Sequence, residues 1–565
     1  MRSATLAVTL LVSTAALADH PYRKGAVAAA QAEAAAAGRQ MLEQGGNAVD
    51  AAVAAALVMG VVAPYHSGLG GGGFAVVHTA KDQKTRVLDF REVAPKGASR
   101  DMFLKDGALV PGASLDGALA VAVPGAIAGY VELQAKYGVL PRKAVFAPAI
   151  FHAKKGMWAT PQFVRNATTR RDCLAKDSEA AELFLRKDAS GAWQPPKVGE
   201  QIPQTQLGAT LSEIAFAGSA AVLKGRIGKA IADTVQSKGG VLTQDDLTRF
   251  TPRWREPLVG SYRGHVVATM PPPSAGGITV LQVLGALEKF GPKGLASRDV
   301  PTLHVFIEAL RRSYVDRYRF LGDPAFVEVP VKQLVSPEWV DATLAAVNPK
   351  HAGDSQALLK GAAPPRPEGT HTTHISAIDA QGNAVAMTTT INYLFGSCVV
   401  AKGTGILLND EMDDFAAAPG SSNEYGLLAS EANAVAPGKV PLSSMSPTLV
   451  FDGDGKNVLL AVGAPGGSTI PTTVIQVVSN VVDAQMSAQR AVGFGRLHHQ
   501  WLPDVVRTDA QALEPETQKA LEALGHVVKA SPPWGDPQAV VRDPVTGLFS
   551  AGSDPRYEGQ GAGLD

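Results

Sequence analysis

The pattern that most restricts the fold of this chain lies between residues 372 and 390. Residues 375–378 and 384–387 alternate in the manner of strands, and Gln381-Gly382 between them indicates a tight turn. A turn centred on Gln381, or on the bond that follows it, places Thr390 opposite Thr372 or one step away. Directly opposed residues have Cβ atoms about 4.5–5.5 Å apart, so the two hydroxyl groups are expected to be neighbours. A purely structural ladder is the alternative, because threonine is common in strands.

The composition indicates one large globular body. Of the 565 residues, 45% are hydrophobic, and the 58 glycines and 38 prolines stay below the proportion that marks a low-complexity sequence. No charged, Ser/Gly-rich or Pro-rich linker separates independent units. Because predicted strands occur in both halves of the chain with helices around them, we expect stacked sheets between helical layers.

The charges and the apolar runs exclude two classes of partner. The 52 basic and 52 acidic residues cancel, so no overall field draws the chain to nucleic acid or to an anionic membrane. The Ala-rich run over residues 51–62 is too short to span a bilayer, and Asp50 and Pro64 bound it, so we expect a core helix and no membrane span. A small molecule is the expected partner.

Residues 1–18 have the features of a signal peptide. They contain Arg2, an apolar stretch over residues 6–12 and a small-residue end at residues 16–18. A buried N-terminal helix is the alternative, but residues 19–21 end the apolar run where a signal peptide would be cut. We therefore expect export, to the periplasm or to the medium.

The chain has only two cysteines, Cys173 and Cys398, which is too few for a disulfide framework. They could pair in an oxidising compartment, but two unpaired buried thiols are the expected state.

Glycines and caps organise the N-terminal part. Residues 28–42 are expected to form an Ala-rich helix, and Asn47 is expected to cap a second helix that ends near Val61. Residues 68–73 formally match a dinucleotide-binding fingerprint, which requires a strand, a glycine turn and then a helix. Here a helix precedes the glycines and the strand-like residues 74–78 follow, so we expect close backbone packing and no bound nucleotide.

Farther along, a helix is expected over residues 303–320, and the prolines at 271–273 are expected to form an ordered loop before another helix.

Long motifs throughout the chain resemble the γ-glutamyltranspeptidase family. Those that resemble its small subunit are residues 369–376, 379–386, 407–415, 441–448 and 463–468, and those that resemble its large subunit are residues 89–92, 270–274 and 321–324. They occur in the family's order and cover nearly all of the chain after the signal peptide. The resemblance implies an αββα N-terminal-nucleophile hydrolase of mixed α/β class that needs no cofactor.

The resemblance also implies a maturation step. Thr372 would be the nucleophile, and a threonine hydroxyl needs a base, which a free α-amino group of pKa about 7.7–8.0 can supply. Cleavage of the His371-Thr372 bond would create that amine and a heterodimer of a large subunit (residues 19–371) and a small catalytic subunit (residues 372–565). Thr390 would orient the Thr372 hydroxyl, and His371 is given no catalytic role.

The remaining site residues follow from the same resemblance. Gly466 and Gly467 would stabilise the oxyanion through backbone N–H groups. Arg91, with Ser443 and Ser444, would bind the α-carboxylate of a γ-glutamyl group. The acceptors for its α-ammonium would be Asn392, Glu411 and Asp414.

No metal is expected. The acidic run over residues 410–414 lacks the spacing of a calcium loop, and the pairs His371/His374 and His498/His499 lack the other ligands or the shared face of a metal site.

Residues 416–439, with Pro419, Gly420, Tyr425 and Gly426, resemble a lid loop that some family members have. An ordinary surface loop is the alternative, and Tyr425 with Asn433 favours the lid.

The expected activity is cleavage of γ-glutamyl compounds such as glutathione, with transfer of the acyl group to water or to an amino acid or peptide. The alternatives within the fold are a cephalosporin-type acylase and a poly-γ-glutamate transferase. An exported binding protein without catalysis is the alternative from another class.

Overall fold

The computed structural model describes residues 20–291, 293–359, 371–418, 422–423, 427–428, 430–510 and 512–565. The expected signal peptide, residues 1–18, lies outside these ranges, as do Pro419, Gly420, Tyr425 and Gly426 of the expected lid. Among the described residues, no helix combines the length and the apolar character that a membrane crossing requires.

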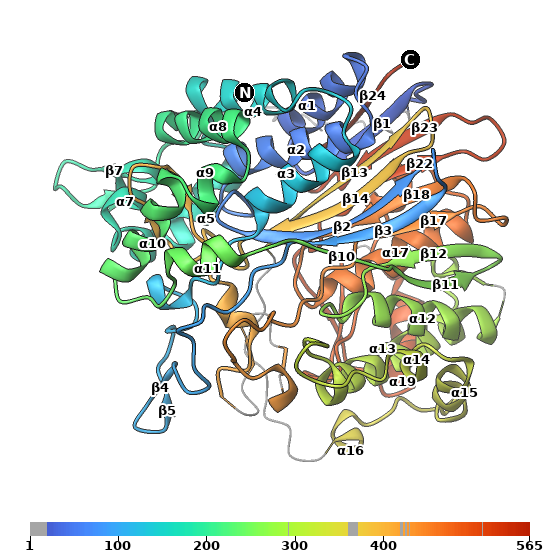
Figure 1. Cartoon of the computed structure of the whole chain (residues 1–565). Coiled ribbons are helices and arrows are strands. Elements are labelled where there is room, and N and C mark those ends of the chain that lie inside the picture. The colour runs from blue at the N-terminus through green and yellow to red at the C-terminus, as the bar shows by residue number, and fades with distance from the viewer. Residues whose placement is uncertain are drawn as a thin grey trace, which may run out of the picture.

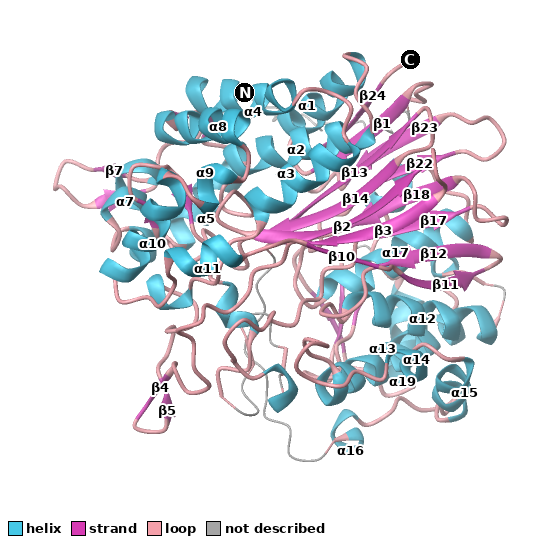
Figure 2. Ribbon diagram, in the orientation of Figure 1, coloured by secondary structure: helices cyan, strands magenta, loops and turns pink. Residues whose placement is uncertain are grey.

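Two antiparallel sheets lie face to face at the centre of the structure (Figure 2). In spatial order the first holds β10 (Arg253–Arg255), β3 (Lys84–Asp89), β2 (Gly72–Thr79), β14 (Ala384–Thr390), β13 (Thr373–Asp379), β1 (Gly25–Ala29) and β24 (Gln560–Gly563). The second holds β11 (Leu258–Tyr262), β12 (His265–Thr269), β17 (Thr448–Phe451), β18 (Val458–Gly463), β22 (Gln538–Arg542) and β23 (Phe549–Ser553). The first sheet therefore joins strands from the two ends of the chain, whereas the second begins only at Leu258.

Helices cover the outer side of each sheet (Figure 1). On the side of the first sheet lie α1 (Ala32–Glu43), α2 (Ala48–Val62), α3 (Ala126–Tyr137), α4 (Arg142–Lys155) and α8 (Thr205–Ala217), and on the other side α12 (Gly276–Phe290), α13 (Val300–Phe320) and α17 (Thr469–Val482). Separate apolar clusters fill the space between the sheets and the space under each helical layer. This arrangement confirms the expected αββα fold.

Shorter elements surround this body. The helices are α5 (Pro161–Thr169), α6 (Arg171–Leu174), α7 (Ser178–Phe184), α9 (Ala220–Leu223), α10 (Arg226–Ser237), α11 (Gln244–Arg249), α14 (Val331–Leu334), α15 (Pro337–Ala345), α16 (Ser355–Leu358), α18 (Ala488–Gly493) and α19 (Pro515–Ala523). Small sheets are formed by β4 (Leu104–Lys105) with β5 (Ala108–Leu109), β6 (Met157–Trp158) with β9 (Gln201–Ile202), β7 (Arg186–Lys187) with β8 (Trp193–Gln194), β15 (Val400–Ala401) with β16 (Ile406–Leu407), and β19 (Leu497–His498) with β20 (Val506–Thr508) and β21 (Val528–Ala530).

Helix α2 begins and packs as its sequence predicts. The Asn47 side chain accepts hydrogen bonds from the N–H groups of Val49 and Asp50, at 3.0 and 3.1 Å, and the Asp50 carboxylate accepts from the Asn47 N–H at 3.2 Å. This reciprocal capping box satisfies the first free N–H groups of the helix. Nearly every residue of α2 is buried, because the helix lies between the first sheet and its neighbours α1 and α4. As expected, the prolines at 271–273 lie in a loop before a helix, α12, and a helix, α13, covers residues 303–320.

The expected helix over residues 28–42 is wrong at its start. Residues 25–29 form strand β1, which pairs with β13 on one side and β24 on the other, and α1 begins only at Ala32. Alanine favours a helix in isolation. Two ladders of backbone hydrogen bonds and complete burial outweigh that preference at this position in the sheet.

Close backbone approach explains the glycines at residues 68–73, as expected. They lead into strand β2, which begins at Gly72 and pairs with β14, and a Cβ at Gly72 would collide with the Glu92 carboxyl group. A side chain at this position would therefore disturb the neighbourhood of the site described below.

The central hairpin has the register that the sequence predicts. Thr373 pairs with Thr389 and His374 with Thr388 in the antiparallel ladder of β13 and β14, so Thr372 lies opposite Thr390. Strand β14 also pairs with β2 and β13 with β1, which places the hairpin in the middle of the seven-stranded sheet.

The expectation of two unpaired thiols is wrong. Cys173 and Cys398 form a disulfide between positions 225 residues apart in the sequence, with Cα atoms 5.9 Å apart. The fold brings the α6 segment against the chain that follows β14, a contact that the spacing of two cysteines cannot reveal.

Candidate active site

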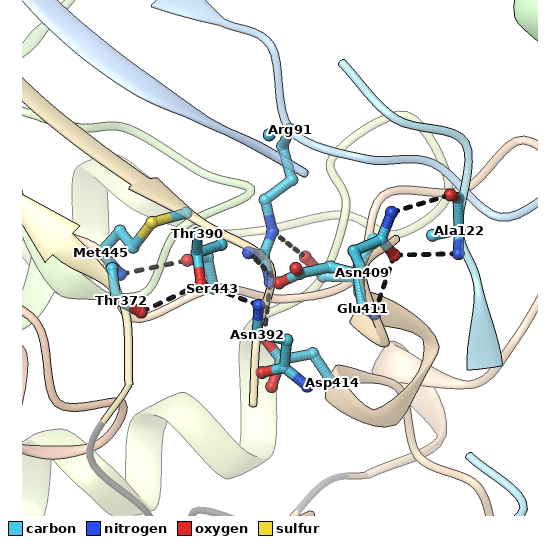
Figure 3. A network of polar contacts seen from close by, with 12 residues as sticks. Arg91, Ala122, Thr372, Thr390, Asn392, Asn409, Glu411, Asp414, Ser443 and Met445 are labelled. Atoms are coloured by element: carbon cyan, nitrogen blue, oxygen red, sulfur yellow. Dashed lines mark hydrogen bonds and ion pairs between the residues drawn. The ribbon is translucent and has the colours of Figure 1, made fainter. Parts of the chain in front are cut away.

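The two threonine hydroxyl groups meet at one end of the central hairpin. Thr372 Oγ1 and Thr390 Oγ1 lie 3.1 Å apart, and both residues are buried (Figure 3). The N–H of Asn392 donates to Thr390 Oγ1 at 2.8 Å, so Thr390 can direct its own proton to Thr372. Thr372 also has a φ of 138°, a conformation that is strained for a β-branched residue.

A cavity in front of Thr372 gathers nearly all the residues that the sequence singles out. Its lining consists of Arg91, Thr372, Thr390, Asn392, Glu411, Asp414, Leu427, Ser443, Ser444, Met445, Gly467 and Ile470. Of the predicted site residues, only Gly466 is outside this set. Gly466 directly precedes Gly467 in the turn between β18 and α17, where both residues have positive φ, 124° and 54°.

The turn at Gly466 and Gly467 leads into helix α17. The carbonyl of Gly466 accepts hydrogen bonds from the N–H of Thr469 at 3.0 Å and from its hydroxyl at 2.9 Å, which fixes the turn. Since the N-terminal end of a helix carries partial positive charge, this corner of the cavity favours a developing negative charge.

Arg91 is the centre of a buried charged cluster. Its guanidinium forms ion pairs with Glu411 and, at 2.5 Å, with Asp414, while its Nε donates to the carbonyl of Pro441 at 3.3 Å (Figure 3). Glu411 and Asp414, which are expected to bind the α-ammonium, therefore lie against Arg91, which is expected to bind the α-carboxylate. The two predicted halves of the amino-acid site are adjacent.

Sequence reasoning gave no role to Glu92, which the structure places in the same cluster. Its side chain is fully buried, and burial together with the charge of Glu411 holds the pKa of Glu92 well above its usual range. Burial also raises the pKa of Glu411 to about 7, although Arg91 acts in the opposite direction. The position of Glu92 directly after Arg91 in the sequence was a signal that it belongs to the site. The direction in which the Glu92 side chain points, however, depends on how the chain turns after β3.

Asn409 is a second residue whose role the sequence did not reveal. Its side-chain oxygen accepts from the N–H groups of Ala122 and Glu411, both at 3.0 Å, and its amide donates to the carbonyls of Gly70 at 2.7 Å and Ala122 at 3.0 Å (Figure 3). All of its hydrogen-bonding capacity is used. Asn409 therefore fixes the turn that carries Glu411 to the glycine-rich entrance of β2.

The serines at residues 443 and 444 also line the cavity. Ser443 is held by the proline loop, since its N–H donates to Pro273 at 3.0 Å and its carbonyl accepts from Ala275 at 2.8 Å. The hydroxyl of Ser443 accepts from the N–H of Met445 at 3.1 Å (Figure 3). This loop thereby presents both hydroxyl-bearing residues to the cavity.

Part of the expected lid lies at the cavity. Leu427 is in the lining, the Asn423 amide donates to the Asp414 carboxylate at 2.7 Å, and the Asn433 amide donates to the Asp414 carbonyl at 2.6 Å. Tyr425 lies outside the described residues. The described parts of residues 416–439 therefore contact a predicted substrate-binding residue directly.

The histidines that were set aside as metal ligands have structural partners. His374 contacts the hydroxyls of Thr388 and Ser376 at 2.8 and 3.0 Å, and burial lowers its pKa to about 3. His498 contacts Thr472 and Gln500, whereas His499 contacts Asp504. These contacts give each ring a role in packing.

Two facing antiparallel sheets between helical layers, with a threonine hydroxyl at the start of a central strand, define the class of N-terminal-nucleophile hydrolases. The model of the family described as Gamma-glutamyltranspeptidase matches residues 34–564, and the chain belongs to this family.

Individual relatives agree with this assignment. The chain is 41% identical over 533 residues to a glutathione hydrolase proenzyme of Pseudomonas sp. (strain A14), covering 94% of this chain and 90% of the relative. It is 40% identical to the glutathione hydrolase proenzyme of Escherichia coli (strain K12), covering 95% and 91%. Among solved structures, a cephalosporin acylase from Bacillus halodurans superposes with a TM-score of 0.84 at 28% identity, covering 97% of both chains.

Proposed function

We propose that the chain is an exported γ-glutamyltranspeptidase and glutathione hydrolase that matures by cutting its own His371-Thr372 bond. The observation that carries the proposal is the buried hydroxyl pair of Thr372 and Thr390, 3.1 Å apart, beside a cavity lined by Arg91 and Asp414. The names of the relatives, glutathione hydrolase proenzyme, indicate glutathione as the substrate and imply a precursor that is cleaved.

Maturation supplies the base that the intact chain lacks. Before cleavage the nitrogen of Thr372 is an amide and cannot take a proton, whereas the free amine has a pKa of about 7.7–8.0. The Thr372 hydroxyl attacks the carbonyl carbon of His371, the peptide nitrogen leaves as the new amine, and water hydrolyses the resulting ester. The strained φ of Thr372 supports this step, because cutting the bond before Thr372 removes that torsional constraint.

We assign His371 a positioning role and no proton transfer. It is buried, its ring packs against Tyr393 with centroids 4.6 Å apart, and burial holds the pKa of His371 well below its usual range. The imidazole is therefore neutral at neutral pH. Its contacts position the peptide bond that is cut.

In the mature enzyme the same hydroxyl attacks the γ-carbonyl of the donor. The amine of Thr372 takes the hydroxyl proton and then gives it to the leaving amine, while Thr390 holds the hydroxyl in place. The N–H groups of Gly466 and Gly467 stabilise the oxyanion at the start of α17. Water or an amino-acid amine then attacks the γ-glutamyl ester and releases the enzyme.

The charged cluster recognises the amino-acid head of the donor. The α-carboxylate binds Arg91, Ser443 and Ser444, and the α-ammonium binds Asn392, Glu411 and Asp414. A zwitterionic head adds one charge of each sign to a cluster that already holds both signs in contact. The net charge of the buried cluster is then unchanged by binding, which limits the cost of desolvation.

Export is supported by the disulfide between Cys173 and Cys398, because such bonds form and persist in oxidising compartments.

A cephalosporin-type acylase is the second candidate, and the similarity to the Bacillus halodurans acylase favours it. A comparison of γ-glutamyl-p-nitroanilide with glutaryl-p-nitroanilide, which lacks the α-amino group, separates the two. We expect turnover of the γ-glutamyl compound to be far faster. Equal rates would replace the transpeptidase proposal by the acylase.

A further inference from the structure

The disulfide joins two segments that lie on opposite sides of the bond proposed to be cut. Cys173 is in α6 and belongs to residues 19–371, whereas Cys398 follows β14 and belongs to residues 372–565. Both cysteines are buried, with 8% and 2% of their surface exposed. A bulky reductant therefore reaches the sulfur atoms poorly while the protein is folded.

The disulfide anchors the end of a segment that has an unusual backbone conformation. Between β14 and Cys398, three residues other than glycine have positive φ: Asn392 at 70°, Phe395 at 56° and Cys398 itself at 60°. Such conformations persist only where the surroundings impose them. Asn392 lines the cavity and donates to Thr390, so the shape of this loop bears directly on the site.

Arg170 reinforces the same contact from the other segment. Its guanidinium donates to the carbonyls of Leu394 at 3.0 Å and Gly396 at 3.1 Å, and it lies 3.3 and 3.2 Å from the two sulfur atoms. An ion pair with Asp116 at 2.7 Å holds the guanidinium in turn. The disulfide therefore stands in a buried polar contact between the segments, and not on a mobile surface.

We propose that the disulfide between Cys173 and Cys398 is an inter-subunit crosslink, so that the mature enzyme is two chains joined by one covalent bond. The two thiols lose two protons and two electrons to an external disulfide, either a protein oxidant or a small-molecule disulfide, which is reduced to two thiols. The inference rests on the proposed cleavage at Thr372, because without that cut the disulfide closes a loop within one chain.

Electrophoresis of the exported full-length protein tests the proposal. Free thiols are first blocked with iodoacetamide, and denatured samples are then run with and without reductant. We expect wild type to give one band without reductant and two bands with it. Cys173→Ser and Cys398→Ser should each give two bands in both conditions, and Thr372→Ala, which cannot be cut, should give one band in both. Mass spectrometry of the unreduced digest should contain a peptide pair joined through Cys173 and Cys398.

The crosslink should also change how the mature enzyme loses activity. A covalent link turns reassociation of the subunits into an intramolecular event with an effective concentration of about millimolar. In mild urea, inactivation of the oxidised wild type should be independent of protein concentration. Inactivation of Cys398→Ser should become faster on dilution.

The failures are distinguishable. Two wild-type bands without reductant, with both cysteines alkylated, would overturn the crosslink and leave the proposed maturation standing. One wild-type band even after reduction would overturn the cleavage, and the inter-subunit link with it. Inactivation of Cys398→Ser that does not depend on concentration would contradict the role of the link in holding the subunits together.

Discussion

The hydroxyl pair and the charged cluster, although they line one cavity, are built in different ways. Thr372 and Thr390 are 18 residues apart, and a single hairpin sets their separation. Arg91 and Asp414 are 323 residues apart, and their ion pair depends on the packing of both sheets and the loops between them. In the first region, the strand register sets the contact between two neutral hydroxyl groups. The second buries several charges and depends on each partner being present.

This difference predicts which substitutions affect maturation and which affect only substrate recognition. A change at the nucleophile should abolish both. A change in the charged cluster should leave self-cleavage intact, because that reaction uses a backbone carbonyl inside the chain and no amino-acid head. The predictions below run from the largest expected effect to the smallest.

Thr372→Ala should remove both maturation and turnover. The variant should remain one chain, and turnover of γ-glutamyl-p-nitroanilide should fall by roughly four or more orders of magnitude, as for nucleophile loss in other hydrolases. N-terminal sequencing of the smaller wild-type fragment should begin at Thr372. A fragment that begins elsewhere would refute Thr372 as nucleophile, and a single wild-type chain would revive the non-catalytic binding protein.

Arg91→Ala and Asp414→Ala should each weaken head recognition without stopping maturation. Removing one partner of a desolvated charge pair costs about 2–5 kcal/mol, so kcat/KM should fall by roughly two orders of magnitude. Both variants should still separate into two chains on a reducing gel. Arg226→Ala is a matched control, because Arg226 pairs with Glu213 of α8 and neither residue lines the cavity. Unchanged kinetics in Arg91→Ala would place the amino-acid head elsewhere.

Thr390→Ala should have a smaller effect, because it removes one hydrogen bond between neutral hydroxyl groups. Such a bond contributes about 0.5–1.5 kcal/mol, so kcat should fall roughly threefold to tenfold with little change in thermal stability. Thr390→Ser keeps the hydroxyl and should restore most of kcat. If the serine variant is as slow as the alanine variant, the methyl packing of Thr390 is what matters and the orienting role is wrong.

Glu411→Gln should change the pH profile of kcat/KM. Because the pKa of Glu411 is raised to about 7, its carboxylate is lost as the pH falls below 7 and forms as the pH rises through 7. Wild-type kcat/KM should therefore rise through this region, in addition to the rise caused by the Thr372 amine near pH 8. The glutamine variant should lose the step near pH 7. On the acid side, the limiting slope of its log(kcat/KM) against pH should therefore be about one unit smaller than that of the wild type. Glu213→Gln, which changes a carboxylate outside the cavity lining, should keep the wild-type profile.

The same contrast explains which site features were visible in the sequence. The period of two and the turn at Gln381-Gly382 predicted the register of the hairpin, and the ladder confirms it. The capping role of Asn47 is also local and is confirmed. Arg91, Glu411 and Asp414 were identified by their resemblance to a family, and no local pattern would have brought them together.

By itself, the sequence determined the central hairpin, helix α2 with its Asn47 cap, and the family, because each depends on short-range geometry or on long ordered motifs. The tertiary structure alone decided that residues 25–29 are a strand, that Cys173 meets Cys398, and that Glu92 and Asn409 support the charged cluster. These features arise where distant segments exclude water from one another. Burial and pairing across such contacts outweigh the local preference of the chain, and the local sequence does not encode which segments will meet.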